Sequence, residues 1–330
     1  MSATKSLAWI FRNRKSIQKG GAVSFAQWKK AYDTCIQLEA SSFSQFDKAV
    51  LGGALSKYPA FAFAAGYQSA IRTLVPDITK LDNSNELSMA AFCITEKQGN
   101  RPRNIDTCIK DGHITGSKSF VSCGMEAKYV LVAAKNGSEI NDRATPKLKM
   151  VLLSADGEGV RLQRKPEMSF IPEISHAELH MTATEIKPVH GVEAILPGDG
   201  YDCYMKPFRT IEDTYVTAAL LGYHMSLSLD LNLPSGHTES LMNQILALSA
   251  LSELPPADDE THLALAGTLR LVDSLLDPTH IAAIGPSTIG SDEFARWNRD
   301  AKLLTVANSI REARTKRAWQ NINRRDDPTV

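Results

Sequence analysis

The sequence predicts an α+β chain in three regions: an N-terminal helical domain, a middle β-barrel or sandwich, and a C-terminal helical bundle. Apolar residues recur at helical spacing near both ends of the chain. Between about Met89 and Pro197 the spacing shortens towards two, which is typical of strands. We therefore expect domains at residues 1–88, 89–203 and 204–330.

The N-terminal region has the period of packed helices from about Phe25 to Leu81. Within it, FDKAVLGGALSKYPAFAFAAGYQSAIRTLV is rich in alanine and glycine, and such small side chains let helices approach closely. The chain has no run of about 18 apolar residues, so no membrane span is predicted. Four residues interrupt this apolar stretch: Asp47, Lys48, Lys57 and Pro59.

The middle region contains short β-branched or alternating runs. They are MAAFCITE, HITGSKSFVS, KYVLVAAK, LKMVLLSA, GVRLQR and AELHMTATEI. Turn sequences such as KDGH and KNGS separate them. The helical period then returns and ends in one long basic stretch, SDEFARWNRDAKLLTVANSIREARTKRAWQNI. Acidic residues are interleaved there, so we expect a solvated face of the bundle.

Composition excludes several classes of protein. The 330 residues include 37 basic and 37 acidic side chains, and zero net charge argues against nucleic-acid binding. The five cysteines are scattered without a CxxC pair, as in reduced thiols of a cytoplasmic protein. His176 and His180 share a predicted strand, where a core or surface role is favoured over a metal site.

Four local sequences resemble signatures of the acyl-CoA dehydrogenase superfamily, in the order that this family has them. AAFCITEKQG is similar to the strand and turn that open its middle domain, and DGHITGSKSFVSCGMEAKYVLVAAK to its second signature. ILPGDGYDCYMKPFRTIEDTYVTAALLG resembles the linker into its helical bundle, and RWNRDAKLL its Arg-Asp-Ala-Lys helix. Together they cover residues 45–320 and imply a divergent, shortened member with the family's α, β, α order.

The resemblance implies an FAD-dependent oxidoreductase of the kind found in fatty acid metabolism. Such an enzyme removes hydrogen from the α and β carbons of an acyl thioester carried by CoA or a carrier protein. An electron-accepting flavoprotein and further copies in a homo-oligomer are the other implied partners.

The resemblance assigns the flavin contacts to two strand segments: Phe92, Ile94 and Thr95 in the first, and Phe120, Val121 and Ser122 in the second. The two hydroxyl residues would bind the polar edge of the ring. The four apolar residues are equally typical of a barrel core.

Several positions depart from the family pattern. Its Gly-Ser-Asp loop reads Gly99, Asn100, Arg101, and the resemblance places Asn100 and Arg101 near the substrate. Arg101 or Arg103 could pair with a phosphate, although a solvated loop arginine is commoner. Two segments that usually reach a partner subunit's FAD are absent or replaced, at DLNLPSGHTES and IGPSTIGS.

The catalytic base is the largest departure. Many members carry a glutamate shortly after Arg-Asp-Ala-Lys, where this chain has Asn308, and an amide cannot accept the α-proton. Other members carry it on the first bundle helix, where Glu212 matches, and desolvation could raise its pKa usefully.

Simpler explanations exist for the acidic residues on this helix. An acid favours the first turn of any helix, with Thr210 as a plausible N-cap. Neighbouring Arg209 could bind a thioester-linked phosphate or pair with Asp213. The alternative function is therefore a non-catalytic binding or scaffold subunit that keeps the fold.

Overall fold

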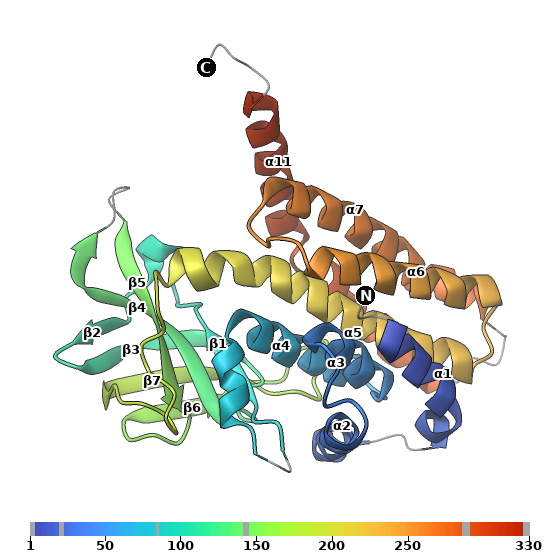
Figure 1. The fold of residues 1–330 in the computed structure, drawn as a ribbon, viewed down its shortest axis with the longest axis horizontal. Helices are drawn as coiled ribbons and strands as arrows, with labels where there is room; N and C mark the ends of the chain where they lie inside the picture. The colour runs from blue at the N-terminus through green and yellow to red at the C-terminus, as the bar shows by residue number, and fades with distance from the viewer. Residues whose placement is uncertain (1–3, 20–22, 84–85, 141–144, 286–290, 326–330) are drawn as a thin grey trace. The chain divides into compact units, whose positions relative to one another are not determined.

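The computed structural model describes residues 4–19, 23–83, 86–140, 145–285 and 291–325. Figure 1 shows helices first, then a mixed sheet, then helices, so the predicted fold class is confirmed. Contacts divide the chain into two compact units. Unit 1 comprises Met1–Ala70, Ser169–Glu173 and Thr210–Val330, and unit 2 comprises Ile71–Met168 and Ile174–Arg209.

Unit 1 is built from helices, two of which (α4 and α5) run on into unit 2. They are α1 (Thr4–Lys19), α2 (Phe25–Leu38), α3 (Gln45–Ala54), α4 (Pro59–Leu74), α5 (Lys206–Asp230), α6 (Ser235–Ser252), α7 (Asp259–Leu275), α8 (Pro278–Ile284), α9 (Ser291–Asp300), α10 (Lys302–Thr305) and α11 (Asn308–Arg325). The basic end of the chain is thus three helices, where the sequence predicts one. No helix in the described ranges is both long and apolar enough to cross a bilayer.

Small residues let α3 pack directly on α5. A Cβ added to Gly53 would collide with the backbone carbonyl of Ala219, and one added to Gly222 would collide with that of Val50. Ser226 of α5 also donates a hydrogen bond from its hydroxyl to the carbonyl of Ala54 at 2.8 Å. The alanine- and glycine-rich segment is therefore buried for the reason predicted: side chains larger than hydrogen would separate the two helices.

Within the described ranges, unit 2 holds seven strands and three short helical turns. They are η1 (Pro76–Leu81), β1 (Ala90–Cys93), η2 (Pro102–Asn104), β2 (Cys108–Lys110), β3 (His113–Ser122), β4 (Tyr129–Ile140), β5 (Pro146–Ser154), β6 (Val160–Arg164), β7 (His176–Glu185) and η3 (Tyr201–Met205). The strands form one mixed sheet in the order β1-β4-β2-β3-β7-β6, and β5 pairs with β4.

Five strands of unit 2 share one hydrophobic core cluster. It is made of small and β-branched side chains from β1, β3, β4, β5 and β7, among them Ala91, Val121, Val132 and Leu179. Strand β4 pairs in parallel with β1 and β2 and antiparallel with β5, so it lies inside the sheet and has no free edge along these pairings.

Candidate active site

The two strand segments expected to contact the flavin lie side by side in unit 2. The backbone N–H of Ser119 in β3 donates to the carbonyl of Thr95 at 2.8 Å, and the Ser119 hydroxyl reaches the same oxygen at 3.3 Å. The residues that follow β1 therefore lie against β3 at Ser119, the residue before Phe120.

A buried ion pair joins the two segments next to these hydrogen bonds. The ammonium of Lys118 lies 2.7 Å from the Glu96 carboxylate and donates to the carbonyl of Ala133 at 2.7 Å. Glu96 also accepts hydrogen bonds from the backbone N–H groups of Asp106 and Thr107 and from the Thr107 hydroxyl. Burial acts to raise the pKa of Glu96, but Lys118 and these donors lower it overall, so the carboxylate stays charged.

Three of the apolar side chains assigned to the flavin differ in their surroundings. Phe92 packs its ring 4.1 Å from that of Phe208, and Val121 is wholly enclosed in the sheet core. Ile94 is half-buried. Core packing therefore accounts for Phe92 and Val121 without a ligand.

Of the six assigned residues, Phe120 is the most accessible. This ring is 37% exposed and lies 4.9 Å from the ring of His176, whose pKa burial lowers to about 4. Thr95 and Ser122 are half-buried, and neither hydroxyl has a hydrogen-bond partner within the residues described. An exposed aromatic ring with hydroxyls free to donate is an arrangement that can receive a flat, polar-edged ligand.

The substrate-loop residues follow a tight turn. Backbone hydrogen bonds join Glu96 and Gly99 in both directions, at 2.9 and 3.0 Å, and Gly99 has a φ of 117°, which favours glycine. Asn100 is half-buried and Arg101 is exposed. Arg209, also half-buried, has no ion pair in the described part of the chain.

In unit 1, the Arg-Asp-Ala-Lys motif anchors a loop. The Asp300 carboxylate is fully buried and accepts the backbone N–H of Ile171 at 2.8 Å. Arg299 pairs with Asp300 at 2.7 Å and with Glu173 at 2.6 Å. The motif that carries much of the family resemblance thus ties residues 169–173 to the helical bundle.

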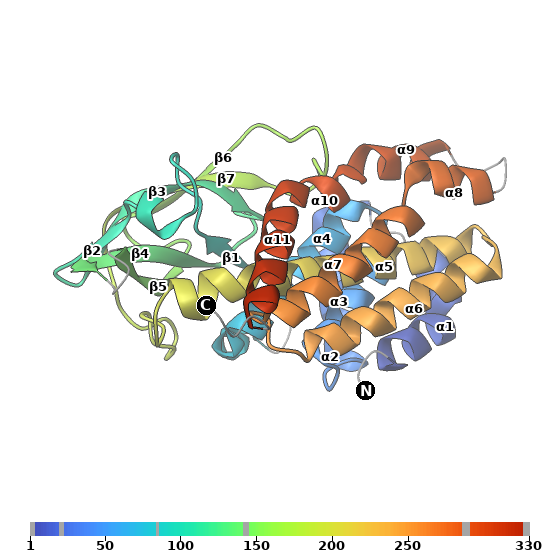
Figure 2. The ribbon, with the colours of Figure 1, turned by 90° about the horizontal axis from the view of Figure 1, so that it is seen from above.

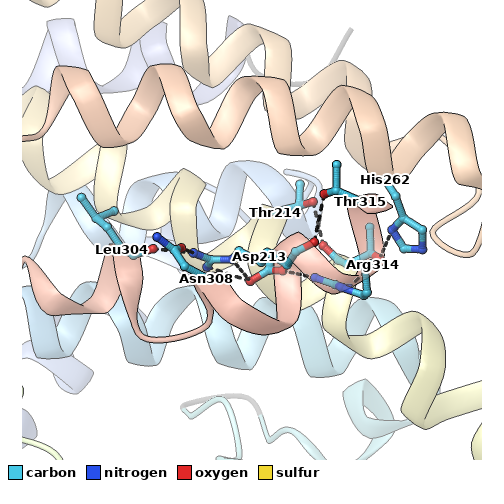
Figure 3. Close-up of polar contacts among 9 residues, drawn as sticks. Asp213, Thr214, His262, Leu304, Asn308, Arg314 and Thr315 are labelled. Carbon is cyan, nitrogen blue, oxygen red and sulfur yellow. Dashed lines mark hydrogen bonds and ion pairs between the residues drawn. The ribbon is translucent and has the colours of Figure 1, made fainter. Parts of the chain in front are cut away.

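Arg311 connects the two places where the family carries its base, near Asp213 and Asn308, which Figure 3 labels. Its guanidinium donates to Asp213, the neighbour of Glu212, at 2.8 and 3.1 Å, and to the Asn308 side-chain oxygen at 3.2 Å. It also donates to the carbonyl of Leu304. Arg314 adds a second ion pair to Asp213 at 2.6 Å. Sequence positions 212–213 and 308 are therefore close in space, and two arginines occupy that region.

Two expectations for α5 are wrong. Helix α5 begins at Lys206 and continues from the η3 turn, so Thr210 lies inside the helix, where the N–H groups that follow it bond to carbonyls of the preceding turn. Thr210 is no N-cap; its hydroxyl lies 3.1 Å from His262 Nδ1. Asp213 does not need Arg209, because Arg311 and Arg314 already bind both of its oxygens.

Glu212 lies in the second turn of α5 and is half-buried. It belongs to unit 1, whereas the flavin segments belong to unit 2, and its role as the base stays a prediction. Of the segments that usually reach a partner's FAD, IGPSTIGS lies largely outside the described residues.

Sequence reasoning missed Lys118 and Arg311. For Lys118 a signal was present: alternation from Ile114 places it on the inward face of β3, and a buried lysine requires an acid. Arg311 gave no such signal, because its partner Asp213 is 98 residues away and pairs with it only in the folded bundle.

No protein-family model matches the sequence, and no curated protein matches it. Solved structures do match over nearly the whole chain. The prolyl acyl carrier protein oxidase AnaB is 14% identical with a TM-score of 0.67, covering 95% of this chain and 98% of its own. PigA with FAD and proline is 12% identical with a TM-score of 0.68, covering 97% of each chain.

Butyryl-CoA dehydrogenase from Megasphaera elsdenii is 14% identical with a TM-score of 0.64, covering 97% of this chain and 96% of its own. Identities at this level establish shared fold alone. The chain therefore has the acyl-CoA dehydrogenase fold, which confirms at the level of structure the resemblance seen in its sequence.

Proposed function

We propose that the chain is an FAD-dependent oxidoreductase that dehydrogenates an acyl thioester between its α and β carbons. The observation that carries the proposal is that Thr95 and Ser122, on neighbouring strand segments, are half-buried with no hydroxyl partner among the described residues, while Phe120 in the second segment exposes its ring. Their donor chemistry fits the polar edge of a flavin, and Phe120 fits its flat face.

FAD, when bound, would supply the hydride acceptor for this reaction. In the proposal, Thr95 and Ser122 donate hydrogen bonds to the ring edge, while Phe92, Ile94, Phe120 and Val121 form its apolar surroundings. Glu212 takes the proton from the α carbon. Loss of that proton and of a hydride from the β carbon leaves the enoyl thioester, so the atoms and electrons balance.

Substrate contacts are assigned to Asn100, Arg101 and Arg209. The thioester carrier is CoA or a carrier protein; the matched structures are named for both, as a butyryl-CoA dehydrogenase and as a prolyl acyl carrier protein oxidase. The electrons would leave through an electron-accepting flavoprotein. A homo-oligomer is also proposed, on the resemblance to the family alone.

Colour is the first test of cofactor binding. The purified protein should absorb at about 450 nm, as flavins do, and should lose that absorbance when an acyl-CoA is added without oxygen. Thr95→Val and Ser122→Ala should each weaken FAD binding about tenfold, because each removes one hydrogen bond. Thr182→Val, at an exposed position of β7, is the control.

The test of the base uses Glu212→Gln. This variant should keep FAD bound and should no longer bleach with acyl thioester, whereas Glu239→Gln, at an exposed site of α6, should behave as the wild type. Undiminished bleaching of Glu212→Gln would remove Glu212 from the mechanism.

A non-catalytic subunit is the second candidate. The Asn308 amide and the arginine-bound carboxylate of Asp213 favour it, because neither group can serve as a base. A colourless protein that does not take up added FAD would support this second candidate against the first.

A further inference from the structure

Helix α11 has an outer face whose cations form no ion pair with the described residues of unit 1. Its inner side packs on α7, where Ala318 is buried, and Arg311 and Arg314 bind Asp213. On its outer side Lys316, Arg317 and Arg324 are exposed. Among the described residues none of these three cations has an ion pair.

These cations share one side of the helix. At about 100° per residue, Lys316, Arg317 and Arg324 fall within an arc of about 100°. Trp319, which is 54% exposed, lies about 60° from Lys316 on the other side. We call these four residues the cationic face of α11. In Figures 1 and 2, α11 crosses α7, and in Figure 1 its last turns extend beyond that helix.

The surplus of charge is local to this helix. From Asn308 to Arg325 there are six basic residues and a single acid, Glu312, although the whole chain has zero net charge. Arg311, Arg314 and Arg325 are neutralised by acids of α5 and α7. On the outer face Glu312 falls about 40° from Lys316 and offsets one of the three cations. This face still keeps a surplus of positive charge, so it attracts an anionic partner.

Trp319 indicates that the partner is a protein. An exposed tryptophan beside cations has the composition of a binding hot spot, which pairs an aromatic anchor with charges at its rim. A second copy of the chain fits poorly, because two-fold pairing of this helix brings the same cations together. Nucleic acid fits poorly as well, since three unpaired cations are few for phosphate recognition.

We propose that the cationic face of α11 docks an acidic carrier protein that delivers the acyl thioester. This inference rests on the proposed function, and it chooses the carrier protein over CoA as the carrier of the substrate. The location supports it, since the inner side of α11 binds Asp213, the residue next to the proposed base. A carrier docked on the outer side is then separated from that region by the thickness of one helix.

The experiment measures binding directly and does not depend on turnover. The probe is a purified acyl carrier protein of net negative charge that has its phosphopantetheine arm attached and a fluorophore at its N-terminus. The full chain is titrated into it, and the fluorescence anisotropy of the probe reports binding. Lys316→Glu/Arg317→Glu/Arg324→Glu should weaken binding at least about tenfold, and Trp319→Ala about tenfold. Added salt should weaken the wild-type complex.

The control reverses three exposed cations on the N-terminal helices of the same unit: Arg14→Glu/Lys15→Glu/Lys30→Glu. It changes the net charge equally and should leave binding unchanged. Equal weakening by both triple variants would overturn the inference, because attraction would then be a property of net charge.

Three further results would overturn it. The first is that the carrier protein does not bind. The second is that single-stranded nucleic acid binds the same face more tightly than the carrier protein does. The third is that light scattering shows a dimer, which Trp319→Ala converts to a monomer. The proposed function is judged separately. Flavin that bleaches with an acyl-CoA in a protein that does not bind the carrier would refute this inference alone, whereas α11-dependent carrier binding by a colourless protein would refute the oxidoreductase alone.

Discussion

Replacing Asp213 by asparagine should destabilise unit 1 strongly. The Asp213 carboxylate receives hydrogen bonds from Arg311 at 2.8 and 3.1 Å and from Arg314 at 2.6 Å. The side chains of the three residues are only 11%, 16% and 22% exposed, respectively. Asparagine keeps the shape but removes the charge, which leaves two guanidinium groups facing each other.

Breaking a buried pair by removing one partner costs about 3 to 5 kcal/mol. The partial exposure of Arg314 puts the expected loss at the lower end, about 3 kcal/mol. Urea unfolding followed by the helical circular dichroism signal measures it, with an unchanged denaturant slope as the check on comparable unfolding. Arg325→Ala is the matched control: its ion pairs are 57% exposed on the arginine side, so the loss should stay below about 1 kcal/mol.

A double-mutant cycle separates the ion pair from general damage. Arg314→Gln should cost less in the Asp213→Asn background than in the wild type, because there it relieves repulsion between guanidinium groups. If Asp213→Asn lost no more stability than Arg325→Ala, or if the two substitutions were additive, the network would not hold α11 on α5 as argued.

Two further predictions concern buried ionisable groups. Lys118→Met should lower the free energy of unfolding of unit 2 by about 3 to 5 kcal/mol, because it leaves Glu96 without its cation, and Glu96→Gln in that background should restore part of the loss. The rate at which the fully buried Cys93 thiol is alkylated in urea measures the loss. Additive losses from the two substitutions would contradict the prediction. Burial lowers the pKa of His224 to about 3, so the unfolded state binds more protons below pH 6.5 and stability falls from there towards pH 3. His224→Phe should therefore remove about 3 kcal/mol of the stability that the wild type loses between pH 7 and pH 4. The control His113→Phe, at an exposed site, should lose stability as the wild type does. Equal acid sensitivity of His224→Phe and the wild type would refute the assignment.

The fold was predictable because its signals are local. Helical period, strand alternation and the small residues around Gly53 report directly on which surfaces are buried, and the order of four motifs adds the connectivity. The long C-terminal helix was predicted poorly for a physical reason. Its apolar period continues through Asp300 and Lys302, but the Asp300 carboxylate binds the Ile171 backbone, 129 residues away, and the helix is interrupted there.

The candidate site was less predictable because its charges are set by partners distant in sequence. The motifs assign Thr95 and Ser122 to the flavin, which stays a prediction, but Lys118 was given no role although it lies in the same signature as Ser122. The expectation that the basic end of the chain is merely a solvated face also came from counting interleaved acids. In the folded bundle, acids from α5 and α7 neutralise one side of α11, and the other side keeps its charge.

Restoring a carboxylate at position 308 should not restore a base. Asn308 begins α11, where the helix dipole stabilises negative charge, and its side-chain oxygen already accepts a hydrogen bond from Arg311 at 3.2 Å. Asn308→Glu would place an anion beside that guanidinium, which favours the charged form and lowers the pKa of the new carboxyl. A base must instead be desolvated to reach a useful pKa.

We therefore expect Asn308→Glu to raise the free energy of unfolding by about 0.5 to 1 kcal/mol through the dipole and Arg311. In the Glu212→Gln background it should produce no bleaching of flavin by acyl thioester. Bleaching there would show that the carboxylate acts as a base despite Arg311. Adding Arg311→Gln separates the two effects: if the arginine is what suppresses basicity, bleaching should appear only when both residues are changed. The arginine, more than the missing glutamate, would then be what distinguishes this chain chemically from the enzymes it resembles.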